Sequence, residues 1–492
     1  MSFLEDSPGS NRMSIRSPPT LEELARQALL RNEALAISAL EDLPWMLFPA
    51  LFKEAFHGRL TRLVKAMVAA WPFPCLPVGA LMNTFNLEMV QEMLDGLDAL
   101  LTQNIRPRTG KLREIDFRRV HHRFWTVWAG AEDRDCSAET VSEKQEVKPP
   151  LSYELTQPLQ VITDLYFRFQ LDEAETNFLE WAQQREDSLQ FCCVNMKIES
   201  LSLDDVSTIL TVFQPDHIQV LELSIDWSWP TLAQFSPYLA HMRNLHTLSL
   251  VQIPTDRLGL DDLPGSEEEP VRHFLSQFST LSSLQHLSLN GLSLASKHMK
   301  LLLRNLKTPL ESFSVTHCRL FQSHLRHLSR CERLHQLKHL DMCGVPLSRL
   351  GMKPLRVLLE KVANTLETLG FQGCGIKDSQ LSVLLPALSQ CSQLTKVNFY
   401  FNDFSVNVLS DLLRHTANFT KMATEQYPIP LECFDEFGYF SRELVVQLCL
   451  GLVDTLRAIR EPKDISFATV LCRGCLKRRV SDLEARVCPC LQ

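Results

Sequence analysis

The sequence lacks a long apolar run, and its first residues lack the apolar core of a secretory signal. No uninterrupted apolar stretch approaches the roughly 20 residues that a membrane-spanning helix needs. The N-terminal segment MSFLEDSPGSNRMSIRSPP is mainly polar and contains no apolar core, which excludes a secretory signal in this segment. We therefore expect a protein of the cytoplasm or the nucleus that does not bind a membrane.

An excess of positive charge is also absent. The chain has 50 Lys and Arg against 58 Asp and Glu, for a formal net charge of −8. This balance argues against direct nucleic-acid binding. The 15 cysteines are an odd number scattered along the chain. In a cytosolic protein we expect them to be reduced and to pack mostly as small apolar residues.

Catalytic signatures are missing as well. The sequence has no G-x-S-x-G, no H-E-x-x-H and no protein kinase motif set. Gly370, Gly373 and Gly375 follow a predicted strand, but their order is not that of a dinucleotide fingerprint and no Gly-Lys-Ser/Thr follows. Their simplest use is a tight bend. We expect no cofactor and no catalytic site on this chain.

What the sequence has instead is a leucine-spaced repeat. The stretch LETLGFQGCGI starts at Leu366 and has apolar residues at +3, +5 and +10, with a cysteine at +8. The same spacing starts at Leu284, Leu310, Leu337 and Leu394, at intervals of about 28 residues. This is the leucine-rich repeat pattern L-x-x-L-x-L-x-x-N/C-x-L. It predicts an α/β solenoid, or horseshoe, with a parallel sheet on the concave face and helices on the convex face.

The pattern also starts at Leu245 and Ile218, and looser copies start at Leu189, Ile162, Leu112 and Leu63. The pattern therefore predicts repeats over residues 61–404. The wide spacing of the early copies indicates insertions, which we place near 79–110, 133–150 and 256–270. The expected flanking parts are a disordered segment over 1–19, a helical segment and N-terminal cap over 20–60, and a C-terminal cap with a cysteine-containing tail over 405–492.

Side chains that stand between the strand leucines would form the binding surface of the predicted horseshoe, because successive residues of a strand point to opposite faces. Gln285, Thr368, Gln372 and Lys396 are candidates for contact with a protein substrate.

Two amphipathic segments precede the repeats. In TLEELARQALL, Thr20 and Glu23 form a capping box, and Leu21, Ala25 and Leu29 lie on one stripe of the predicted helix. In LPWMLFPAL, Pro44 is placed at the first turn of a second helix. Leu43, Leu47 and Leu51 share its apolar stripe. By physical chemistry alone, both stripes would most simply be buried against the first repeats as a cap.

Two sets of potential metal ligands have simpler explanations. Cys472, Cys475, Cys488 and Cys490 could hold a structural zinc ion, but the second pair is C-x-C, and reduced thiols are the alternative. His324, His327, Cys331 and His335 share a helical stripe that we interpret as an exposed helix face. We predict no metal site.

Several stretches are similar to those of a known family. They are ARQALLRNEALAISALEDLP, LFPALFKEAFHGR and KLREIDFRRVHHRFW, together with the regular repeats and the terminal cysteines. Over nearly its whole length, the chain resembles the PRAME (preferentially expressed antigen of melanoma) family. That resemblance implies a leucine-rich-repeat substrate receptor of a cullin-2 ubiquitin ligase, which docks through two short helices.

The resemblance assigns the first helix to an Elongin C-binding box, Ser/Thr/Pro-Leu-x-x-x-Cys-x-x-x-aliphatic. Thr20, Leu21 and Leu29 fit this pattern, and Ala25 replaces the cysteine. The smaller side chain would weaken the contact with Elongin C by on the order of 1 kcal/mol.

The second helix corresponds to a cullin-2 box, apolar-Pro-x-x-apolar-x-x-x-apolar. Leu43, Pro44, Leu47 and Leu51 fit it fully. The boxes stand in the expected order, ahead of the repeats.

The function implied by the resemblance is that of an adaptor without its own catalytic site. Its partners would be Elongin B/C, cullin-2 and a RING-box protein, and it would hold a protein substrate for ubiquitination and proteasomal degradation. The resemblance also implies negative regulation of transcription, differentiation and apoptosis. The competing hypothesis is a non-catalytic scaffold, such as a nuclear corepressor, that acts by binding alone.

Overall fold

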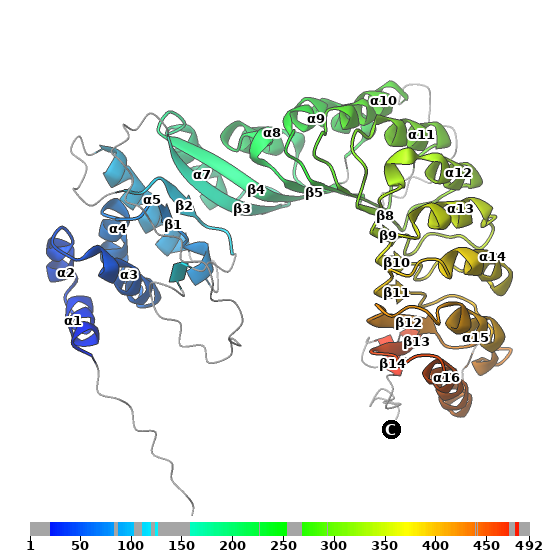
Figure 1. Ribbon diagram of the computed structural model, residues 1–492. Helices are drawn as coiled ribbons and strands as arrows, with labels where there is room; N and C mark the ends of the chain where they lie inside the picture. Colours follow the sequence, from blue (N-terminus) through cyan, green and yellow to red (C-terminus); the bar gives the residue numbers. More distant parts are fainter. Residues whose placement is uncertain are drawn as a thin grey trace, which may run out of the picture. The chain divides into compact units, whose positions relative to one another are not determined.

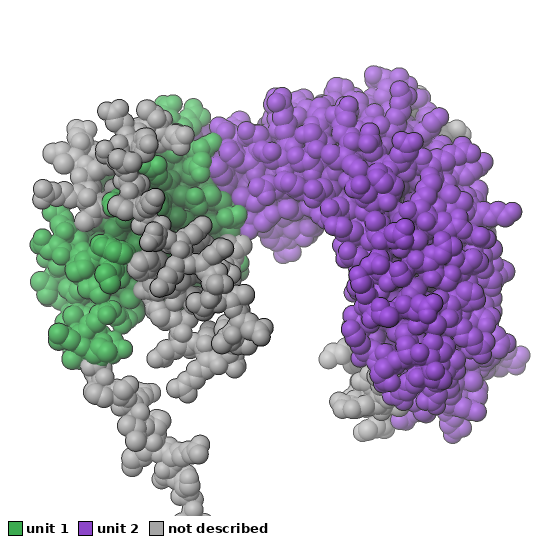
Figure 2. Space-filling view, viewed as in Figure 1, with its two compact units in different colours: residues 1–163, 185–190 green, residues 164–184, 191–492 purple. Residues whose placement is uncertain are grey.

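The computed structural model describes residues 20–82, 87–102, 111–119, 124–125, 158–225, 227–252, 268–292, 294–437, 439, 441–471 and 478–481. The chain divides into two compact units, which Figure 2 shows in separate colours. Unit 1 comprises residues 1–163 and 185–190, and unit 2 comprises residues 164–184 and 191–492. The predicted insertion at 133–150, the predicted disorder of 1–19 and the four tail cysteines lie outside the described residues.

Unit 1 is mainly helical. Its helices are α1 (Leu21–Leu30), α2 (Glu33–Ala39), η1 (Trp45–Leu47), α3 (Phe48–His57), α4 (Thr61–Ala69), η2 (Gly79–Leu81) and α5 (Leu87–Thr102). The strands β1 (Cys75–Leu76), β2 (Glu114–Asp116) and the start of β3 (Leu159–Arg168) pair in parallel. The predicted repeat copy at Leu63 is wrong, because Leu63 lies inside helix α4. Its apolar spacing fits a buried helix as well as a strand.

An aromatic cluster forms the core of unit 1. Phe52 packs edge-on against Trp71, with ring centroids 5.2 Å apart, and stacks on Trp125. Both indole N–H groups are satisfied, since Trp71 donates to the carbonyl of Cys75 and Trp125 to that of Pro77. The packing of these rings holds helix α3 against the segment that leads into β1.

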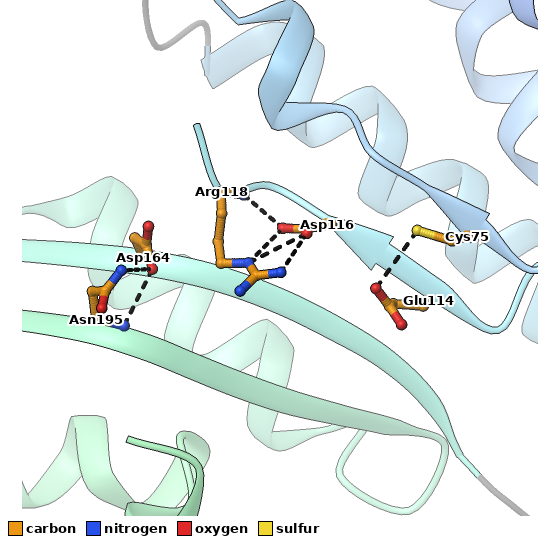
Figure 3. Close-up of polar contacts among 6 residues, drawn as sticks. All are labelled: Cys75, Glu114, Asp116, Arg118, Asp164 and Asn195. Carbon is orange, nitrogen blue, oxygen red and sulfur yellow. Dashed lines mark hydrogen bonds and ion pairs between the residues drawn. The ribbon is translucent and has the colours of Figure 1, made fainter. Parts of the chain in front are cut away.

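Two polar contacts lie at the short strands of unit 1 (Figure 3). The guanidinium of Arg118 pairs with the buried carboxylate of Asp116, and Arg118 Nη2 lies 2.7 Å from Asp116 Oδ2. Cys75 on β1 donates to Glu114 on β2 at 3.5 Å. Burial, followed by the charge of Glu114, raises the pKa of the Cys75 thiol to about 12. The thiol is therefore a packing group and not a reactive one.

Unit 2 is the predicted leucine-rich-repeat solenoid. Its strands follow one another in the sheet in sequence order, and all pair in parallel except the last pair. They are the end of β3, β4 (Leu189–Glu199), β5 (Val220–Ile225), β6 (Thr247–Gln252), β7 (His286–Asn290), β8 (Ser312–Thr316), β9 (His339–Asp341), β10 (Thr368–Gly370), β11 (Lys396–Asn398), β12 (Thr424–Pro428), β13 (Ile465–Leu471) and the antiparallel β14 (Arg478–Ser481). In the first turn of this unit, Asp164 on β3 accepts from the backbone N–H and side-chain amide of Asn195 on β4 (Figure 3).

Helices cover one side of the strands of unit 2. Figure 1 shows α8 to α16 on the outer side of the stack and the strands on the inner side. The helices are α7 (Glu173–Gln183), α8 (Leu203–Val212), α9 (Trp229–His241), α10 (Glu268–Ser276), α11 (Ser296–Asn305), α12 (Gln322–Arg330), α13 (Lys353–Val362), α14 (Asp378–Leu388), α15 (Val406–His415) and α16 (Arg442–Arg457), with short turns η3 (Pro215–His217), η4 (Gln277–Ser279), η5 (Glu332–Leu334) and η6 (Leu431–Cys433).

At Cys374 and Asn402 the +8 position works as the sequence pattern predicts. Asn402 is buried, its amide donates to the carbonyls of Phe371 and Phe399, and its oxygen accepts from the N–H of Ile376. The Cys374 thiol donates to a carbonyl of the preceding repeat at 3.0 Å. Gly373 and Gly375 have φ values of 66° and 62°, so the glycines serve the bend.

The sheet continues beyond the predicted end of the repeats at residue 404. Strands β12 and β13 extend it in parallel, with Val397 paired to Glu425 and Glu425 paired to Ile465. Helix α16 covers this end, as its apolar sequence predicts. The predicted cap of 405–492 thus contains further repeats, which the leucine pattern missed because a core position of β12 holds a glutamate.

Candidate docking surface

Helix α1 begins at the predicted capping box. The Thr20 hydroxyl accepts from the N–H of Glu23 at 3.2 Å, and the Glu23 carboxylate accepts from the N–H of Thr20 at 2.7 Å. These two bonds satisfy N–H groups that the helix itself leaves without partners. The capping box therefore fixes where α1 starts and which way its faces point.

The apolar face of α1 points away from the protein. The side chain of Leu21 is 84% exposed. Leu24, Ala25 and Ala28 lie on the same side of the helix and are also exposed. Leu29, which the sequence pattern places on the stripe of Leu21 and Ala25, is half-buried at the border of this face, and Arg26 and Leu30 are half-buried on the other side of the helix. A cap would bury this apolar face, so the cap interpretation does not describe α1.

Charged groups hold α1 in this orientation. Arg26 Nε donates to Glu54 Oε1 on α3 at 2.8 Å, and Arg26 Nη1 lies 3.0 Å from Glu22 Oε1 one turn back. The Arg26 side chain is largely buried, so its pair with Glu54 is less screened than a surface pair. Arg26 thus ties the polar side of α1 to α3 and leaves the apolar side free.

The second predicted box is divided between surface and core. Pro44 is exposed and precedes η1, so it stands one residue ahead of the predicted first helical turn, and the helix proper, α3, starts at Phe48. Leu43 and Leu47 are half-buried, and Leu51 is 0% exposed. Leu51 therefore holds α3 against the core of unit 1 and offers no surface to a partner in this conformation.

Exposed apolar side chains that the box patterns do not include lie on the same segment. Trp45 and Met46 follow Pro44 and are both at least half exposed, and Leu35 on α2 is also exposed. Sequence reasoning missed them because the templates fix only selected positions. We call Leu21, Leu24, Ala25, Ala28, Leu35, Pro44, Trp45 and Met46 the N-terminal apolar surface.

The structure brings some of the predicted substrate-facing residues together. Thr368 and Lys396 are paired in register on neighbouring strands. The Thr368 hydroxyl lies 2.9 Å from His339 Nδ1, and Gln372 accepts from the amide of Asn398 at 2.9 Å. Gln285 is exposed but lies just before strand β7, in a different row of the sheet.

The row that contains Thr368 includes residues that the sequence analysis did not select. Following the register from β7 to β11, it runs through His286, Ser312, His339, Thr368 and Lys396. These residues stand at +2 of each repeat, whereas Gln285 stands at +1. The two-residue period of a strand is the signal that identifies the row. The result is a polar row of hydroxyl, imidazole and amine groups along the sheet.

The candidate metal ligands on α12 do not form a metal site. His324 is buried, not exposed as predicted, and its Nδ1 accepts from the N–H of Phe321 at 2.9 Å. His327 faces Ser296 on α11. Within the described part of the chain, no three His, Cys, Asp or Glu side chains are placed to hold a metal ion. None of the described helices is long and apolar enough to cross a membrane.

Comparison with known proteins matches both units to one family. Residues 18–125 match the PRAME N-terminal domain and residues 159–490 match the PRAME C-terminal domain. The chain belongs to the PRAME family. It is 44% identical to human PRAME family member 12 over 97% of this chain and 98% of that protein, and 42% identical to mouse oogenesin-3 over 97% of this chain and 95% of that protein.

Solved structures with a similar fold are distant from this PRAME-family chain. The yeast Rad7 and Elc1 complex matches with a TM-score of 0.43 and 13% identity, over 86% of this chain and 96% of that chain. A Legionella pneumophila leucine-rich-repeat protein, LegL7, matches with a TM-score of 0.36 and 16% identity, over 64% of this chain and 92% of that chain. Family membership and the repeat fold together support a protein-binding role.

Proposed function

We propose that this chain is the substrate-recognition adaptor of a cullin-2 RING ubiquitin ligase. Helix α1 binds Elongin C in an Elongin B/C complex, and the segment from Leu43 to Leu47 binds cullin-2. The cullin recruits a RING-box protein and the ubiquitin-charged enzyme. A protein bound to the sheet of unit 2 is thereby directed to ubiquitination and proteasomal degradation, in the cytoplasm or the nucleus.

The observation that carries this proposal is the exposure of the apolar face of α1. Leaving Leu21 in water forgoes the roughly 1.5–3 kcal/mol that a buried leucine contributes. A helix that is capped at its start by Thr20 and tied to α3 by Arg26 does not need that face for its own fold. Exposed, rigidly held apolar faces of this kind mark protein interaction sites.

The second part of the docking segment supports the same conclusion. The three consecutive residues Pro44, Trp45 and Met46 are exposed, whereas Leu51 anchors α3 in the core. Trp45 is edge-on to Phe73, with ring centroids 5.8 Å apart. A large aromatic side chain that packs on a neighbouring ring and is still half exposed is typical of an interface anchor.

Substrate recognition is assigned to the row from His286 to Lys396. Its groups donate and accept hydrogen bonds, and a curved sheet of parallel strands offers them as one continuous surface. The adaptor supplies no chemical group to the transfer of ubiquitin. It holds a lysine of the bound protein near the ubiquitin thioester, so its contribution is proximity.

The test is co-purification of the full chain with Elongin B/C and cullin-2. Leu21→Asp should reduce retention of both by at least about tenfold, because it places a charge on the docking face. An aspartate at the first helical position is favourable for a helix, so α1 should persist. Met46→Asp should release cullin-2 and leave Elongin B/C bound.

Gln27→Asp is the matched control, since it adds the same charge to α1 on a side away from Leu21 and Ala25. It should keep both partners. Failure of the unmodified chain to retain Elongin B/C, or retention by Leu21→Asp equal to that by Gln27→Asp, would show that the chain acts as a binding scaffold without a ligase.

A further inference from the structure

A turn at the C-terminal end of unit 2 exposes two aromatic side chains. We call the described residues 431–437, 439 and 441–444, from η6 to the start of α16, the aromatic turn. Phe437 is 78% exposed and Tyr439 is 75% exposed. Among the large hydrophobic side chains of the described residues, only Leu21 is more exposed. Neither aromatic residue belongs to the N-terminal apolar surface or to the polar row of the sheet.

Hydrogen bonds among the described residues tie the aromatic turn together. The carboxylate of Asp435 accepts from the N–H of Phe437 at 3.0 Å and from the N–H of Tyr439 at 2.8 Å. The N–H of Asp435 donates to the carbonyl of Tyr439, and the N–H of Ser441 donates to that of Cys433, both at 2.8 Å. Cys433 is buried. A turn fixed in this way presents its side chains with little entropy left to lose on binding.

Further apolar groups flank the two rings. Leu431 precedes them on η6 and Leu444 follows them on α16, and both side chains are exposed. The turn is anchored at its start as well, because the N–H of Leu431 donates to the carbonyl of Phe404 at 2.8 Å. Apolar side chains on both sides of an ordered aromatic pair make a patch and not a single exposed residue.

The charge around this patch is negative. The segment carries Glu432, Asp435, Glu436 and Glu443, all exposed, against one base, Arg442. A partner with the same sign of charge would be repelled, and a partner with cations would be attracted. Aromatic faces also attract cations directly. Charge and ring chemistry therefore select the same kind of ligand.

We propose that the aromatic turn is a second protein-docking site, which takes a peptide segment that carries Lys or Arg next to apolar side chains. Phe437 and Tyr439 are its anchors, and the four acidic residues are its rim. The site is independent of the cullin-2 assignment, because it uses different residues at the other end of the chain.

The probe is a phage-displayed library of short random peptides, selected on the full chain. Peptides that bind at the aromatic turn should pair Lys or Arg with Leu, Ile or Phe. Measured by fluorescence anisotropy, their affinity should fall at least about tenfold for the variant Phe437→Ser/Tyr439→Ser. It should not change for Val357→Ser, which removes an exposed apolar side chain from α13.

Three results would overturn the proposal. The first is a selection in which no peptide depends on Phe437 and Tyr439. The second is a set of dependent peptides that is acidic or lacks cations. The third is concentration-dependent self-association, seen by sedimentation, that the Phe437→Ser/Tyr439→Ser variant abolishes, since the occupant would then be a second copy of the chain. The same variant should still co-purify with Elongin B/C, so the two proposals succeed or fail separately.

Discussion

Arg460 donates two parallel hydrogen bonds to the carboxylate of Glu425, from Nη1 to Oε1 at 2.7 Å and from Nη2 to Oε2 at 2.6 Å. Glu425 is 1% exposed and Arg460 is 11% exposed. The hydroxyl of Tyr427 donates to the same carboxylate at 2.9 Å, and burial, together with the charge of Glu425, raises the pKa of Tyr427 well above its usual value. In the neighbouring strands this position holds valine and isoleucine.

Arg460→Ala should loosen the last repeats, because it leaves the charge of Glu425 buried without an opposite charge beside it. Breaking such a pair costs about 3–5 kcal/mol. In a repeat protein the effect falls mainly on neighbouring repeats. Amide hydrogen exchange of β12 and α16 measures this loss. The free energy of opening of these elements should fall by a similar amount.

Arg457→Ala provides the comparison. Arg457 is exposed and lies 3.8 Å from the exposed Asp454, and such surface pairs contribute about 0–1 kcal/mol. Replacing both buried partners, Glu425→Met with Arg460→Met, should recover most of the loss, since paired burial costs desolvation. Equal exchange rates in Arg460→Ala and Arg457→Ala would contradict the assigned role of the pair.

His298→Leu should stabilise unit 2. His298 on α11 is 3% exposed, and neither of its ring nitrogens has a hydrogen-bond partner among the described residues. A buried polar group without a partner costs about 1–3 kcal/mol. Leucine fills a similar volume without that cost. Thermal unfolding should shift upward by a corresponding amount, whereas His241→Leu, at an exposed histidine, should not stabilise.

The same substitution should flatten the dependence of stability on pH. Burial, with a further contribution from Lys297, lowers the pKa of His298 in the native state. The unfolded chain therefore takes up a proton as pH falls through about 6.5, while the native chain does not. Acid then favours unfolding. The free energy of unfolding should fall less between pH 7.5 and 5.5 in His298→Leu than in the unmodified chain. If its dependence on pH is the same in both proteins, His298 is not the source of that dependence.

Ala25→Cys should strengthen binding to Elongin C, provided that α1 is the Elongin C-binding helix. The box pattern has cysteine where this chain has alanine, and Ala25 lies on the exposed apolar face. A larger apolar side chain at the contact contributes on the order of 1 kcal/mol, which corresponds to about a fivefold lower Kd. Isothermal titration with purified Elongin B/C measures the change. Gln27→Cys, on another side of the same helix, should leave the Kd unaltered.

The repeat fold of unit 2 is legible in the sequence because each repeat contributes the same buried positions. Leu248 and Leu287 are paired on neighbouring strands, and so are Leu340 and Leu369; all four are buried. A short pattern therefore recurs with every turn of the solenoid. The pattern does not detect a repeat whose core position holds a polar side chain in place of an apolar one. Glu425 breaks it, and only its distant partner Arg460 makes a buried glutamate compatible with the core.

By itself the sequence determined the order of strands and helices from Leu284 to Phe404, the start of α1 at Thr20 and the family to which the chain belongs. Those features depend on local spacing and on short-range hydrogen bonds. Only the tertiary structure decided which apolar residues remain exposed. Leu21 and Leu51 both belong to apolar stripes with the same four-residue spacing, yet one is 84% exposed and the other 0%. Burial depends on what packs against a helix, and that is set by residues far away in the chain.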